Sequence, residues 1–210
     1  MTARVELVTT TGVFSLDGDD FEVENNIWII GDDDEVLVVD AAHDAAPIAE
    51  GVGGRTVVAI VCTHGHNDHI NAAAALAARV GRPPVLLHPA DRMLWDVVYP
   101  HDPPNGTLND GDRCHVAGTE LAVLHTPGHS PGGICLHDRL GTRLFAGDTL
   151  FRGGPGATGR SYSDFPTIIE SIRTKLFALP ADTVVAPGHG ETTTIGDEAP
   201  HLEEWIASGT

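Results

Sequence analysis

The chain has 210 residues, of which 41% are hydrophobic, and it carries 12 basic against 30 acidic side chains. This length and apolar content suffice for a hydrophobic core but are short for two, so we expect a single domain over residues 1–210. A formal net charge of −18 would repel a nucleic-acid backbone or an anionic membrane, which argues against both as partners.

The amino-terminal residues lack the apolar run of a signal peptide, and no stretch approaches the length of a membrane span. We therefore expect a soluble, cytoplasmic protein. The cysteines are widely spaced and form no CxxC pair, so we expect buried core thiols at Cys62, Cys114 and Cys135. The oligomeric state is left open by the sequence.

Two apolar runs near the amino terminus predict a hairpin of core strands. They are Phe21 to Ile30 and Val36 to Asp40, and the acidic turn 31–35 joins them. Asp40 ends the second strand, a position where a carboxylate serves as a turn or helix cap. His43, which follows shortly after, is expected to face solvent.

The stretch THGHNDH at residues 63–69 places three imidazoles and a carboxylate in six consecutive positions, which indicates a metal site. It follows a continuous β-branched run, Val57 to Cys62, typical of a strand buried on both faces. It precedes a run of good helix formers, Ile70 to Val80. The metal loop thus opens at the carboxyl end of a strand, the edge where α/β sheets build their sites.

The spacing within this loop favours two metal positions rather than one. His64 and His66 lie two residues apart on an extended turn and can converge on one ion. The start of the helix carries Asp68 and His69 toward a second point. Neutral imidazoles and carboxylates together are the usual ligands of zinc and other borderline divalent metals, so one loop can supply ligands to two ions.

The segment between Val85 and Cys114 contains four prolines and few strand signals, as a segment that covers a substrate pocket would. Trp95 and Tyr99 are candidates to line that pocket. A short helix that packs on the sheet, followed by a surface loop, explains the same residues and is the interpretation that we favour for each of them.

Three more candidate metal ligands lie downstream, each in a tight turn rich in glycine or proline after an apolar run. They are His129 in TPGHSPGG, Asp148 in GDTLF and His189 in PGHG. The apolar runs predict strands at 121–125, 143–146 and 183–186, with a further strand at 133–137. The order of strand, small-residue turn and ligand therefore occurs four times along the chain.

The glycine-rich segment 151–165 lacks the GK[ST] motif of a nucleotide-binding phosphate loop. Basic side chains are rare in this chain, so those near the site are candidates to bind a substrate carboxylate. The candidates are the basic residues Arg152 and Arg160, together with the nearby hydroxyl of Tyr162. Arg160 has an alternative role, which we favour: an ion pair that ties the loop to a neighbouring acid.

Taken in order, THGHNDH, TPGHSPG, GDTLF and PGHG resemble the motifs of the metallo-β-lactamase superfamily of hydrolases, most closely its glyoxalase II (hydroxyacylglutathione hydrolase) branch. The resemblance implies an α/β (α+β) fold, a four-layer αββα sandwich with a two-metal site at one sheet edge. The implied ligands are His64, His66 and His129 for one metal, Asp68, His69 and His189 for the other, and Asp148 as a bridge. The resemblance also offers Asp40 a second role, support beneath the metal loop.

The activity that the resemblance implies is hydrolysis of a small acyl thioester of a low-molecular-weight thiol. Two divalent metals, most simply zinc, with iron or manganese as alternatives, would activate a water molecule that Asp68 orients and deprotonates. Alternatives are a persulfide dioxygenase with one iron and, less favoured, a lactonase or β-lactamase. Full-length glyoxalase II enzymes carry a further helical segment that binds glutathione. We expect no such segment here, so the carrier thiol stays open, with mycothiol as one option.

Overall fold

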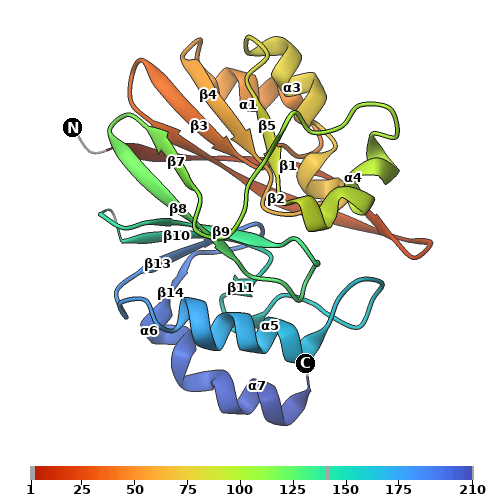
Figure 1. Ribbon diagram of the computed structural model, residues 1–210, viewed down its shortest axis with the longest axis vertical. Helices are drawn as coiled ribbons and strands as arrows, with labels where there is room; N and C mark the ends of the chain where they lie inside the picture. Colours follow the sequence, from red (N-terminus) through yellow and green to blue (C-terminus); the bar gives the residue numbers. More distant parts are fainter. Residues whose placement is uncertain (1–2, 141, 210) are drawn as a thin grey trace.

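The computed structural model describes residues 3–140 and 142–209, and over these residues the chain forms two sheets of six strands each and one two-stranded sheet. Figure 1 shows the two large sheets face to face, with helices on the outer face of each. One cluster of buried apolar side chains lies between the sheets, and another lies under each helical layer. The predicted four-layer αββα sandwich is confirmed.

The first sheet runs in the order β1-β2-β3-β4-β5-β6. Its strands are β1 Arg4–Leu16, β2 Asp19–Gly31, β3 Glu35–Val39, β4 Thr56–Val61, β5 Val85–Leu87 and β6 Gly106–Thr107. The helices between them are α1 Ala45–Val52, α2 Asn67–Ile70, α3 Ala73–Arg79, the 3₁₀ turn η1 Pro89–Asp91 and α4 Arg92–Val98. The predicted hairpin is confirmed, because β2 and β3 pair antiparallel.

The second sheet runs in the order β14-β13-β10-β9-β8-β7. Its strands are β7 Arg113–Val116, β8 Thr119–His125, β9 Ile134–Asp138, β10 Arg143–Gly147, β13 Val184–Pro187 and β14 Thr193–Thr194. The small sheet pairs β11 Leu150–Phe151 with β12 Gly154–Pro155. The remaining helices are α5 Phe165–Ser171, the π-helical turn η2 Ile172–Leu176, α6 Ile195–Glu198, the 3₁₀ turn η3 Ala199–His201 and α7 Leu202–Ser208. In the described part of the chain, no helix has the length and apolarity that a membrane span requires.

Strand β4 shows why a continuous apolar run forms the centre of this fold. Successive side chains of a strand point to opposite faces. Ile60 and Cys62 accordingly pack among the helices of the outer layer, while Ala59 and Val61 pack against the second sheet. Both faces of the strand are buried, and the strand ends directly before the metal loop. The cysteines are buried and free, as predicted.

The long strand β1 is missing from the sequence predictions. It pairs with β2 over thirteen residues, and Asp17 and Gly18, both with positive φ, form the turn between them. An Asp-Gly dipeptide with this backbone is the preferred two-residue hairpin turn. That dipeptide was the available signal, while the polar and partly exposed side chains of β1 form no apolar run.

The predicted helix at residues 70–80 is interrupted, and α2 and α3 flank the break. At the break, the backbone N–H of Ala72 donates to the carbonyl of Ala41 at 3.0 Å. The side chain of Asn71 accepts a hydrogen bond from the backbone N–H of His43 at 2.6 Å. Contacts with the loop after β3 therefore replace helical hydrogen bonds, and they tie that loop to the metal loop.

Phe145 tests the packing between the sheets, because it is 1% exposed and its ring lies 6.1 Å from that of Trp28. We expect Phe145→Ala to lower the free energy of unfolding by about 3–5 kcal/mol, through lost burial and a residual cavity. Urea denaturation of metal-free protein measures this. The control Val97→Ala, at a side chain that is 80% exposed, should change stability by less than about 0.5 kcal/mol. Equal effects would contradict this packing.

Candidate metal centre

Four loops meet at one edge of the sandwich, and each begins where a strand ends. The loops follow β4, β8, β10 and β13, and they carry, respectively, residues 64–69, His129, Asp148 and His189. Hydrogen bonds between loops hold this arrangement: the N–H of Gly188 donates to the carbonyl of Gly147 at 2.8 Å, and the N–H of Ile134 donates to the carbonyl of Thr63 at 2.8 Å. All seven side chains predicted as ligands are brought together here.

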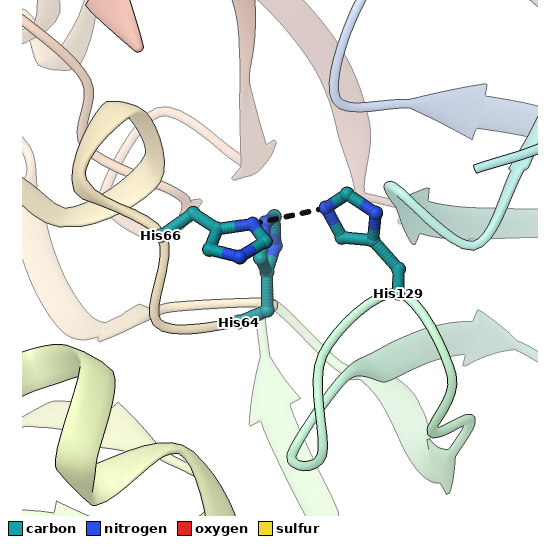
Figure 2. A group of neighbouring side chains, drawn as sticks. All are labelled: His64, His66 and His129. Atoms are coloured by element: carbon teal, nitrogen blue, oxygen red, sulfur yellow. Dashed lines mark hydrogen bonds between the residues drawn. The ribbon is translucent and has the colours of Figure 1, made fainter. Parts of the chain in front are cut away.

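Figure 2 shows the first ligand group, in which His64 and His66 from one loop converge with His129 from another. One ligand atom from each of these imidazoles lies within 4.8 Å of those from the other two. Nδ1 of His66 and Nε2 of His129 are 3.0 Å apart. This matches the three positions predicted for one metal ion.

The second ligand group contains Asp68, His69 and His189, again with ligand atoms within 4.8 Å of one another. Asp148 lies between the groups. Its Oδ1 is 3.4 Å from Nε2 of His69, and its Oδ2 is 3.6 Å from Nε2 of His129 and 3.4 Å from Nε2 of His189. One carboxylate thus faces both groups, as a bridging ligand must.

Buried atoms without partners test whether these residues fit metal ions. Nε2 of His64, Nε2 of His66, Oδ1 of Asp68 and Oδ1 of Asp148 are buried and have no hydrogen-bond partner among the described residues. Leaving a buried polar atom unpaired costs about 1–3 kcal/mol. His66 faces His129 through Nδ1, so its Nε2 points away from that ligand group. The other three atoms, on His64, Asp68 and Asp148, lie in one cluster and fit divalent cations. At Gly188 a Cβ atom would lie 2.4 Å from Oδ1 of Asp148, so this close approach needs glycine.

The electrostatics of the two groups differ. Burial lowers the pKa of His66 to about 3, and it holds the pKa of His64 well below its usual value. Both imidazoles are therefore neutral, the form that binds metal. Burial also acts against protonation of His69, but three carboxylates, led by that of Asp148, raise its pKa well above the usual value. Burial acts in the same way at His189, but the carboxylates of Asp148 and Asp68 together raise its pKa to about 10. The second group thus attracts positive charge, as a proton or a metal ion.

Asp40 supports the metal loop from beneath. Its Oδ1 accepts the N–H of Thr63 at 2.7 Å, and its Oδ2 accepts the Thr63 hydroxyl at 2.9 Å and lies 2.8 Å from Nδ1 of His69. The last contact fixes the orientation of that ring and leaves Nε2 facing the metal position. The helix cap is instead Asp44, whose side chain accepts the N–H of Ala46. Of the two roles open to Asp40, the structure thus selects support.

Asn25 and His43 extend the site beyond the predicted residues. Asn25 is fully buried on β2, with Nδ2 3.2 Å from Oδ2 of Asp68 and Oδ1 2.8 Å from Nε2 of His43. The prediction that His43 faces solvent is wrong, because its side chain is half-buried in this contact. The adjacent asparagines in the apolar strand at 25 and 26 were the available signal, since a buried amide needs polar partners.

A small cavity opens beside the first ligand group, next to His66 and His129. Its volume is about 90 Å³. The described residues that line it are Phe14, Leu16, His66, His129, Ala157, Thr158, Arg160, Ser161 and Ser163. We call it the site cavity. The ion pair that we favoured for Arg160 is confirmed: its guanidinium lies 2.9 Å from Oδ2 of Asp19, and 4.9 Å above the ring of Phe21.

The other predicted substrate contacts lie elsewhere. Trp95 is 3% exposed in the core, and its indole N–H donates to the carbonyl of Asp102. Tyr99 packs against the same core and donates its hydroxyl proton to the carbonyl of Ile70. The alternative of a helix packed on the sheet is therefore correct for this pair. Arg152 forms a surface ion pair with Glu191, and Tyr162 is 57% exposed; neither lines the site cavity.

Comparison with known proteins agrees with this geometry. Residues 21–189 match the family model described as the metallo-beta-lactamase superfamily. The chain belongs to the metallo-beta-lactamase superfamily. Membership in this superfamily, together with the histidine and aspartate cluster, indicates a metallo-hydrolase.

Three relatives show what the chain is similar to within this superfamily. The hydroxyacylglutathione hydrolase GloC of Haemophilus influenzae is 30% identical over 190 residues, which span 83% of this chain and 90% of the relative. The crystal structure of the B3 metallo-beta-lactamase BLEG-1 is 29% identical with a TM-score of 0.78, covering 92% of this chain and 98% of that one. The crystal structure of TTHA1623, in a di-iron-bound form, is 31% identical with a TM-score of 0.73, covering 84% and 93%.

Metal removal tests the fit of these residues to cations. We expect zinc at about 100 times its dissociation constant to stabilise the chelator-treated protein by about 2.7 kcal/mol, because it binds only the folded state. For a chain of this size, that corresponds to a rise of about 5–10 °C in the melting temperature. His129→Ala should reduce the rise. The control His201→Ala, at an exposed histidine paired with Glu204, should keep it. A melting temperature indifferent to zinc would contradict the fit.

Proposed function

We propose that this protein hydrolyses a small acyl thioester of a low-molecular-weight thiol, with two divalent metal ions at the site. The observation that carries the proposal is the position of Asp148, whose oxygens face His69 on one side and His129 on the other. Such a carboxylate suits two metals held close together. The proposed ligands are His64, His66 and His129 for one metal, and Asp68, His69 and His189 for the other.

When bound, the two metals would supply Lewis acidity, which lowers the pKa of water toward neutrality and polarises an acyl carbonyl. The protein supplies orientation and proton transfer. Oδ1 of Asp68 has no hydrogen-bond partner among the described residues, and Nδ2 of Asn25 lies 3.2 Å from its Oδ2. Asp68 can therefore orient a water molecule and accept its proton through one oxygen while Asn25 holds the other.

The leaving group distinguishes a thioester from an amide. A thiolate has a conjugate acid of pKa about 8.5 and can depart unprotonated, whereas an amine must receive a proton as it leaves. The described residues that line the site cavity include no carboxylic acid, lysine or tyrosine, and both of their histidines are proposed ligands. Arg160 keeps its proton at neutral pH. The lining therefore supports departure of a thiolate.

The size and polarity of the site cavity support a small acyl group. Its volume of about 90 Å³ is too small for a whole thiol conjugate, so the carrier would extend toward solvent. Phe14 and Leu16 form one apolar wall, and Ala157 adds to it. The similarity to a relative named hydroxyacylglutathione hydrolase supports the same substrate class.

Oxidation of a persulfide is the competing reaction, and it would use a single iron. The second ligand group favours hydrolysis, because Asp68, His69 and His189 form a group that a one-metal enzyme would not need. The identity of the metal alone does not settle the metal count, since the 31% identical TTHA1623 was crystallised in a di-iron-bound form. Metal count and reaction type must therefore be measured together.

The decisive experiment combines elemental analysis of the purified protein with assays on lactoylglutathione, a lactoyl conjugate of mycothiol, and a glutathione persulfide. We expect two metal ions per chain and release of free thiol without oxygen uptake. Asp148→Ala removes the carboxylate that faces both groups, so it should lower metal content and thioester turnover by at least about 100-fold. One iron per chain with oxygen consumption on the persulfide would overturn the proposal.

Leu16 tests the acyl position. Leu16→Ala removes part of the apolar wall and should cost about 1–3 kcal/mol of substrate binding, a rise in KM of tenfold or more with a smaller change in kcat. The matched control is Val13→Ala on the same strand, at a side chain that is 43% exposed and does not line the site cavity. Equal kinetics in the two variants would place the acyl group elsewhere.

A further inference from the structure

Asp91 is a fully buried carboxylate that belongs to neither ligand group. It ends the turn η1, directly before α4, in the segment that the sequence predicted as a pocket cover. Its backbone is fixed there, because its N–H donates to the carbonyl of His88 at 3.1 Å. Burying a carboxylate costs free energy unless hydrogen-bond donors surround it, so the donors around Asp91 indicate its role in the fold.

The partners of Asp91 come from two ligand loops. Its Oδ2 accepts the backbone N–H of Gly65 at 2.8 Å and the hydroxyl of Ser130 at 2.7 Å, and its Oδ1 accepts the backbone N–H of Gly132 at 2.5 Å. Gly65 lies between His64 and His66, and Ser130 directly follows His129. One carboxylate therefore joins the two loops that carry the whole first ligand group.

The carboxylate of Asp91 and the two ligand loops stabilise each other. Burial raises the pKa of Asp91, and the hydrogen bonds from Ser130, Gly65 and Gly132 act in the opposite direction. The packing is equally close, since a Cβ atom at Gly132 would lie 2.7 Å from Cγ of Asp91. The loops thus stabilise the charge, and the charge fixes the separation of the loops.

We propose that Asp91 is a positioning residue that sets the affinity of the first metal position without acting on the second. This inference rests on the ligand assignment of the proposed function. Asp40 makes the complementary contact, because its Oδ2 lies 2.8 Å from Nδ1 of His69 in the second group. Asp40 also reaches the first group through the Thr63 hydroxyl, which lies 3.1 Å from Nδ1 of His64, whereas the donors to Asp91 at Gly65 and Ser130 adjoin ligands of the first group only.

Asp91→Asn is the direct test. The amide keeps the shape of the side chain but replaces one accepting oxygen with an N–H₂ group, which would face hydrogen-bond donors. Loss of a group that orients metal ligands typically lowers metal affinity about 10–100-fold. Zinc affinity is measured by competition with a chromophoric chelator in two parent variants. His189→Ala weakens the second position and reports on the first, while His129→Ala weakens the first and reports on the second.

We expect Asp91→Asn to weaken zinc binding about 10–100-fold in the His189→Ala parent and less than about threefold in the His129→Ala parent. The control Asp96→Asn, at a surface carboxylate paired with Arg92, should change neither. Melting of the metal-free proteins separates affinity from stability. An equal loss in both parents, or a loss in neither, overturns the inference.

Ser130→Ala covers the case in which Asp91→Asn does not fold. It removes one donor to the carboxylate and leaves the ligands in place, so we expect a smaller loss, about threefold or more, again only in the His189→Ala parent. Unchanged zinc affinity in this variant contradicts the role of Asp91. Parents that bind no zinc overturn the ligand assignment itself. None of these measurements uses thioester turnover, so their result does not depend on whether the proposed substrate class is correct.

Discussion

The shared carboxylate of Asp148 is the constraint on which the rest of the site depends. Its Oδ1 faces His69, its Oδ2 faces both His129 and His189, and these side chains come from separate loops. A buried carboxylate among imidazoles is stable only when positive charge balances it. The loops after β4, β8, β10 and β13 must therefore meet at one edge of the fold. The αββα sandwich achieves this by placing the ends of strands from both sheets at that edge.

Positioning is divided among several buried polar residues that contact different parts of the site. Asp40 holds Thr63 and orients His69, Asp91 joins two loops, and Asn25 contacts Asp68. Because buried hydrogen bonds to charged groups contribute about 1.5–3 kcal/mol each, such contacts fix loop geometry that glycine-rich sequence alone would leave loose. The loops can thus contain the small residues that close approach requires and still hold ligands in place.

The sandwich was predicted through the resemblance of the four motifs to the metallo-β-lactamase superfamily. The convergence of the seven side chains was predicted because a strand, a tight turn and a ligand recur in order and strand ends share an edge. Asp91 could not be predicted, since its partners are backbone N–H groups and a serine hydroxyl far along the chain. Trp95 and Tyr99 were candidates for the pocket because proline surrounds them, with a helix packed on the sheet as the favoured alternative, and the packing confirms that alternative. Strand β1 has an alternating, partly exposed pattern without a core run, so only its Asp-Gly turn marked it.

The charge of the chain limits how it can select a substrate. With a net charge of −18, long-range attraction of an anionic conjugate is unfavourable, and Arg160, the basic side chain in the described lining of the site cavity, is already paired with Asp19 and stacked on Phe21. Under the proposed function, recognition would therefore rest on short-range contacts with the apolar wall and on the metals. For a thioester substrate, such a wall would separate acyl groups by size, at about 1–3 kcal/mol for each methylene, and would not distinguish carriers that stay in solvent.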